Sequence, residues 1–294
     1  MNHYRRAWGD LRRPLRRAIR ESPSATLILH MPKTGGSTLN RFVGQSPSLG
    51  YLALPLSDVP RGACECGATS ACTDHRKRAA IRTGDHGRSS DLPLMVKFNH
   101  ESYGAVDWVR SATRMRAESL PVLLMVRPRR VRLKSMFTDY WTQVATGMGE
   151  LDDYGSTTPH RQRQLKKYLD DAPHYRIADG SIDGMAWFES FSRYGPGVVF
   201  SLDEVFGGDV TRMQRELESG SLIALQTSKI DEFIEGISGL PAPPRIRLSR
   251  TAHDPAVEAA LDDAADLIED LARRDAPFDR AIAEHLGDVD FFVE

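Results

Sequence analysis

The chain has 294 residues, of which 40% are hydrophobic and 27% are charged. That composition is typical of globular proteins and excludes disordered, collagen-like and fibrous ones, and the length suits one large domain or two small ones. No run approaches the roughly 18 to 20 apolar residues of a membrane-spanning helix, and the first residues lack the apolar core of a secretory signal. We therefore expect a cytoplasmic protein.

Charge is distributed unevenly along the chain, although the formal net charge is -1. Residues 1–150 contain 24 Lys and Arg against 12 Asp and Glu (+12), whereas residues 151–294 contain 15 against 28 (-13). We therefore expect the site of an anionic ligand in the first half of the chain.

Residues 1–24 form a basic segment that precedes the first expected strand. Its arginines recur in pairs around Trp8, Leu11, Leu15 and Ile19, which is typical of a basic amphipathic helix that contacts an anionic membrane or polymer. A solvated arm is the alternative. The arginines are Arg5, Arg6, Arg12, Arg13, Arg16, Arg17 and Arg20.

Short apolar runs predict the strands. They are mostly continuous rather than alternating, as expected for parallel strands that are buried on both faces. The runs are 26–31, 93–98, 122–126, 198–202 and, more weakly, 222–225.

Helical patterns lie between these runs and after them. They cover 38–43, 105–117, 129–145, 209–218 and 255–286. Strands that alternate with helices predict an α/β layered domain with a mainly parallel sheet of about five strands flanked by helices. We expect one such domain over 25–294, with insertions at about 44–92 and 146–180 and a solvated acidic face on the C-terminal helices.

A glycine-rich loop follows the first expected strand and opens a helix, with the sequence Pro32-Lys33-Thr34-Gly35-Gly36-Ser37-Thr38-Leu39. Glycines let the backbone approach a ligand closely, and a helix N-terminus adds free N–H groups and partial positive charge. The loop therefore predicts a phosphate or sulfate site. It differs from the Walker A pattern, because Lys33 precedes both glycines instead of following them. The candidate ligand-binding residues are Lys33, Thr34, Gly35, Gly36, Ser37 and Thr38.

This loop resembles the 5′-phosphosulfate loop of sulfotransferases, in the form used by the heparan sulfate and related carbohydrate O-sulfotransferase group. The resemblance implies a P-loop-like three-layer domain and 3′-phosphoadenosine 5′-phosphosulfate (PAPS) as the sulfuryl donor, with adenosine 3′,5′-bisphosphate as the product. It extends over roughly residues 25–286, but only two phosphate motifs in that range are specific.

The second motif begins at the end of the strand at 122–126. Arg127 and Ser135 stand eight residues apart, so that a strand end and a helix can converge on one anion. The segment resembles the family's 3′-phosphate motif, R-D-P-x-x-R-x-x-S, with Arg127, Arg132 and Ser135 in register. It departs from that motif because no Asp follows Arg127 and Pro128 comes one position early.

Catalysis of sulfuryl transfer requires charge neutralisation and a base. Lys33 is placed to neutralise the bridging oxygen as the bisphosphate leaves. His100 follows the strand at 93–98 and is the expected general base for the acceptor hydroxyl. The segment around His100 also resembles the catalytic stretch of the uronyl 2-O-sulfotransferase branch. Glu101 is the alternative base, since other branches use Glu.

The sequence therefore predicts a PAPS-dependent sulfotransferase that acts on a hydroxyl of a carbohydrate or sugar-bearing metabolite. A nucleotide-dependent kinase is the alternative enzyme, and a non-catalytic polyanion-binding protein is the alternative of another class. We expect no nucleic-acid partner, and we expect peripheral membrane contact only through the Arg-rich N-terminus.

All three cysteines lie close together and are followed by a histidine: Cys64, Cys66, Cys72 and His75. Thiolate and imidazole ligands suit tetrahedral zinc, although the C-x-C spacing is tighter than usual. A structural zinc site is one hypothesis, and free thiols in a loop are the other.

Overall fold

The computed structural model describes residues 12–31, 34, 39, 49–54, 93–99, 102–140, 201–238 and 255–287. Within these residues, one sheet has the strand order β2-β3-β1-β4-β5, and all neighbouring strands are parallel. The prediction of an α/β fold with a parallel sheet flanked by helices is confirmed. The strands are β1 (Ala25–His30), β2 (Gly50–Leu54), β3 (Leu94–Asn99), β4 (Val122–Val126) and β5 (Leu222–Gln226).

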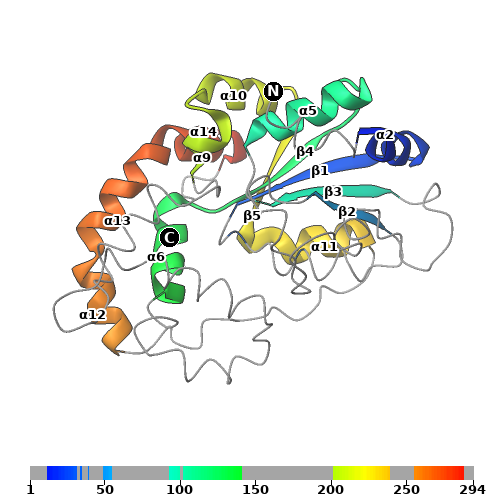
Figure 1. Cartoon of the computed structure of the whole chain (residues 1–294). Helices are drawn as coiled ribbons and strands as arrows, with labels where there is room; N and C mark the ends of the chain where they lie inside the picture. The colour runs from blue at the N-terminus through cyan, green and yellow to red at the C-terminus, as the bar shows by residue number, and fades with distance from the viewer. Residues whose placement is uncertain are drawn as a thin grey trace, which may run out of the picture.

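Helices cover both faces of this sheet (Figure 1). Leu27 and Leu29 of β1 belong to the larger core cluster, and Ile28 between them packs on the opposite face with Ile234. This burial of successive side chains on both faces explains the continuous apolar runs. The larger cluster involves α2 (Arg12–Glu21), α5 (Tyr103–Thr113), α9 (Leu202–Phe206), α10 (Val210–Glu218) and α14 (Ala276–Leu286), and the opposite face packs on α11 (Ile230–Ser238).

A third apolar cluster lies beyond the carboxyl end of β4. Leu133 and Phe137 of α6 (Arg129–Tyr140) pack there against Ile268 and Leu271. The partner helices are α12 (Pro255–Asp263) and α13 (Ala265–Ala272), and the short 3-10 helices η6 (Thr227–Lys229) and η7 (Arg273–Asp275) join neighbouring elements. The C-terminal helices therefore pack on the helix that carries Ser135.

The predicted strand at 198–202 is wrong at its described end. Ser201 is the N-cap of α9 and Leu202 is its first residue, and residues 198–200 lie outside the described part of the chain. The Ser201 side chain accepts a hydrogen bond from the Glu204 N–H while the Glu204 carboxylate accepts one from the Ser201 N–H. This capping box starts a helix where apolar residues alone predict a strand.

The expected insertion at 44–92 contains a strand of the sheet. Residues 50–54 form β2, which pairs with β3 at the edge. Its sequence, Gly-Tyr-Leu-Ala-Leu, is an apolar run as long as β4, so this strand carries the same local signal as the predicted ones. The remainder of 44–92, apart from Leu49, and the whole of 146–180 lie outside the described residues.

The basic N-terminal segment is helical over Arg12–Glu21. Leu15, Ala18 and Ile19 are buried in the larger core cluster, and α2 packs on α5. For these residues the prediction of a solvated arm is therefore wrong. The helix is part of the fold, and its arginine side is the exposed one.

Candidate functional site

Three neighbouring strands precede the three segments that the sequence singles out. β1 lies between β3 and β4, with His30 level with Asn99 and Leu29 level with Leu124. The glycine-rich loop follows β1, His100 follows β3, and Arg127 follows β4. Because carboxyl ends of parallel strands meet at one edge, all three segments start from adjacent positions there.

Four of the predicted site residues are described: Thr34, Arg127, Arg132 and Ser135. The others lie outside the described residues and stay predictions. They are Lys33, Gly35, Gly36, Ser37, Thr38, His100 and Glu101, together with Cys64, Cys66, Cys72 and His75.

Thr34 is fully buried, and its hydroxyl donates a hydrogen bond to the Met31 carbonyl oxygen at 2.8 Å. A hydroxyl has one proton to donate, so the Thr34 side chain in this structure closes the turn after β1. It shapes the start of the loop and has no proton left for a phosphate oxygen.

Arg127 and Ser135 are both half-buried, one directly after β4 and the other on α6. Arg132 is different, because its side chain is completely buried. Its Nη2 donates to Asp275 Oδ2 at 2.8 Å, and its Nε donates to the Arg127 carbonyl oxygen at 3.1 Å. The charge of Arg132 is therefore neutralised inside the protein, and its guanidinium holds the backbone of Arg127.

Asp275 and Asp279 are acidic residues whose importance sequence reasoning missed. The expected solvated acidic face is wrong at these two positions, because both side chains are buried. Asp275 also accepts hydrogen bonds from the Leu202 N–H at 2.9 Å and the Asp203 N–H at 3.1 Å, and Asp279 accepts one from the Arg129 N–H at 3.0 Å. Burial raises the pKa of Asp279 to about 6. Two carboxylates from the C-terminal region thus hold the first turns of α6 and α9.

Lys97 is the second residue that sequence reasoning missed. It lies in β3 level with Ile28 of β1, and only 1% of its surface is exposed. Its Nζ has no hydrogen-bond partner among the described residues, and burial lowers the pKa of the amine to about 7. The signal was visible in the sequence: one lysine interrupts an apolar run that is buried on both faces.

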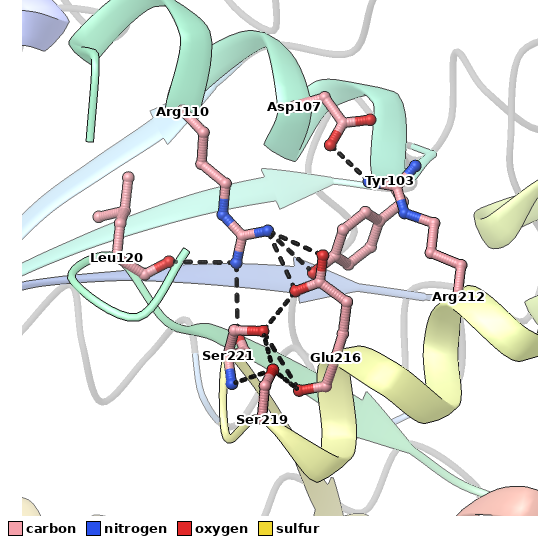
Figure 2. Close-up of polar contacts among 8 residues, drawn as sticks. All are labelled: Tyr103, Asp107, Arg110, Leu120, Arg212, Glu216, Ser219 and Ser221. Atoms are coloured by element: carbon pink, nitrogen blue, oxygen red, sulfur yellow. Dashed lines mark hydrogen bonds and ion pairs between the residues drawn. The ribbon is translucent and has the colours of Figure 1, made fainter. Parts of the chain in front are cut away.

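A polar network joins α5 to α10 and to the start of β5 (Figure 2). Arg110 Nη1 donates to both carboxylate oxygens of Glu216 at 3.1 Å, and Ser221 Oγ donates to the same carboxylate. Arg212 pairs with Asp107, and its guanidinium carbon lies 4.6 Å from the centre of the Tyr103 ring. Burial raises the pKa of Tyr103. Because each charged side chain has an opposite partner, this network clamps α5, which begins three residues after His100.

Among the described residues, no group of three or more His, Cys, Asp or Glu side chains could hold a metal ion. The cysteine cluster lies outside those residues, so the zinc hypothesis stays a prediction. In the same part of the chain, no helix combines the length and the apolar character that a membrane crossing requires.

Comparison with known proteins identified no relative: no family model, no curated protein and no solved structure matches the chain.

Proposed function

We propose that this protein is a P-loop-like, PAPS-dependent sulfotransferase that sulfates a hydroxyl of a carbohydrate or sugar-bearing metabolite. The observation that carries the proposal is the adjacency of β3, β1 and β4, since the candidate base and the two candidate phosphate motifs follow these three strands. Ligands of α/β proteins bind outside the carboxyl ends of such strands.

In the proposed reaction, PAPS is the sulfuryl donor and adenosine 3′,5′-bisphosphate is the leaving group. His100, or Glu101 in its place, takes the proton of the acceptor hydroxyl while the hydroxyl oxygen forms a bond to sulfur. The bond between sulfur and the bridging oxygen breaks, and Lys33 neutralises the charge that develops on that oxygen. Adenosine 3′,5′-bisphosphate then leaves with the bond's electron pair.

Binding of the nucleotide is assigned to the two motifs. The backbone N–H groups and hydroxyls of residues 35–38 are assigned to the 5′-phosphate, and Arg127 with Ser135 is assigned to the 3′-phosphate. Arg132 is assigned a supporting role, because its side chain is committed to Asp275 and to the Arg127 carbonyl. Lys97 is the basic residue of β3, which ends one residue before His100, and it supplies a further positive charge near the candidate base.

Thermal unfolding with a set of nucleotides tests this proposal. Adenosine 3′,5′-bisphosphate at about 100 times its Kd should raise the Tm by on the order of 5–10 °C, and adenosine 5′-monophosphate should do so less. Arg127→Ala should abolish that difference, whereas the control Arg130→Ala, at a half-exposed residue of the nearby helix α6, should retain it.

Equal stabilisation by ATP with Mg²⁺ would favour the kinase alternative. No stabilisation by any nucleotide, together with salt-sensitive binding to polyanions, would favour the non-catalytic alternative. Incubation with labelled PAPS and a panel of glycans, phenols and lipid alcohols then identifies the acceptor class.

A further inference from the structure

A concentrated positive surface lies on α2, remote from the proposed active site and not used by the proposed reaction. At about 100° per residue, the five arginines of α2 fall within an arc of about 140°, and the buried Leu15, Ala18 and Ile19 lie outside that arc. Four of the five are exposed and Arg16 is half-buried. With exposed Arg114 they form what we call the basic face: Arg12, Arg13, Arg16, Arg17, Arg20 and Arg114.

Two elements hold these like charges together. Arg114 is the C-cap of α5 in a left-handed conformation (φ 58°), and Arg20 Nη2 donates to the Thr113 carbonyl oxygen at 3.4 Å. The pKa of Arg16 is lowered chiefly by the charge of Arg20, with further contributions from burial, Arg114 and Arg12. The core packing of α2 therefore keeps the cations close despite their repulsion.

Little negative charge offsets the basic face. Among the described residues, the ion pair in this region joins Arg17 to Glu21 at 2.8 Å, and both side chains are exposed. A surface of this kind, with four to eight exposed basic side chains, attracts the negative potential of anionic phospholipid headgroups. Guanidinium groups are also suited to bidentate contacts with phosphate.

The position of the basic face favours a planar partner. α2 ends just before β1 begins and α5 ends before β4, so the face lies at the amino edge of the sheet, whereas α6 follows the carboxyl edge (Figure 1). We infer that the basic face docks the protein on an anionic phospholipid bilayer through charge alone, with the carboxyl edge of the sheet turned toward water. Leu15 and Ile19 are buried in the protein, so they do not insert into the lipid.

A bilayer fits better than a nucleic acid. The basic face consists of guanidinium groups and includes no aromatic side chain for base stacking and no amide side chain for reading base edges. A planar bilayer also requires contact at only one end of the molecule, which is where these charges lie.

Vesicle flotation tests the inference on the full chain. The wild type should float with vesicles that contain phosphatidylglycerol at low salt, should be released at high salt, and should not float with vesicles of phosphatidylcholine alone. The triple variant Arg12→Gln, Arg13→Gln, Arg16→Gln should bind roughly 10²-fold more weakly. The control Arg215→Gln, Arg273→Gln, Arg280→Gln removes the same charge from exposed residues of α10, η7 and α14 and should bind like the wild type.

Three outcomes would overturn the inference: no binding of the wild type at low salt, equal binding by the triple variant and the wild type, or binding to duplex DNA without binding to vesicles. Unchanged thermal unfolding of both triple variants shows that the fold is retained. The nucleotide experiments above measure thermal unfolding in the absence of vesicles, and the flotation experiment requires no nucleotide. A failure of the proposed enzymatic function therefore leaves this test unaffected.

Discussion

At the scale of single residues, Lys97 is the most unusual feature of the sheet. Its amine has no hydrogen-bond partner among the described residues, and such an amine inside an apolar layer opposes folding whenever it carries a proton. The unfolded chain holds that proton up to its ordinary pKa of 10.5, whereas the folded chain releases it at about 7. Between these values the unfolded state binds more protons, so stability should rise with pH.

Lys97→Met should therefore make the protein more stable near neutral pH. It should also remove the rise of the free energy of unfolding with pH, which is up to about 1.4 kcal/mol per pH unit between pH 7 and 10. Urea unfolding across this range measures both effects. Lys229→Met, at an exposed lysine of η6, is the control and should keep the slope. A less stable Lys97→Met with an unchanged slope would show that the amine is paired. If the proposed function holds, the same variant should lose turnover despite its greater stability.

His100 carries the second prediction at this scale. His100→Ala should lower sulfuryl transfer by roughly 10² to 10⁴-fold and leave the affinity for adenosine 3′,5′-bisphosphate nearly unchanged, because a general base acts on the acceptor. His285→Ala, at an exposed histidine of α14, should have no effect on either quantity. Normal turnover in His100→Ala would move the role to Glu101, which the matching Glu101→Gln variant would reveal.

At the scale of elements, the start of α6 depends on carboxylates supplied from far along the chain. Arg132 and Asp275 are both completely buried, and Asp275 also accepts two N–H groups from the start of α9. One ion pair therefore joins α6, α9 and η7. Removing one partner of such a pair leaves an uncompensated buried charge.

Arg132→Met should destabilise the protein by about 3–5 kcal/mol. The matched variant Arg130→Met, also on α6, breaks the pair of Arg130 with Glu269 of α13, whose side chains are 53% and 44% exposed. It should cost less than about 1 kcal/mol. The midpoint of urea unfolding distinguishes the two. Equal small losses would mean that the buried charges find other partners.

At the scale of the whole molecule, the basic N-terminal helix folds as part of the domain. α2 packs on α5, and its apolar side chains join the same cluster as β1, β3 and β4. The segment that the sequence separates from the domain by composition is therefore continuous with its core.

Leu15→Ala should accordingly lower the free energy of unfolding by about 2–5 kcal/mol, because it leaves a cavity in that core. The exposed neighbour Arg13→Ala should change it by less than about 0.5 kcal/mol. Thermal unfolding should remain a single transition in both variants. Loss of α2 in a separate, earlier transition of the wild type would contradict the packing.

The sequence by itself determined the layer architecture. Strands buried on both faces leave continuous apolar runs, so the four strands β1, β3, β4 and β5 could be predicted from local composition. The glycine-rich loop and Arg127 could likewise be singled out as candidates, because glycine content and charge at strand ends are local properties of the sequence.

Only the tertiary structure decided which strands are neighbours and which charges are buried. The order β2-β3-β1-β4-β5 places the strands before His100, the loop and Arg127 side by side, and strand order depends on packing of distant segments. The pairing of Arg132 with Asp275 spans 143 positions, and an arginine that binds a ligand and one that binds a buried carboxylate look the same in a sequence. Burial separates them, because a guanidinium closed off from solvent must find its counter-charge within the protein.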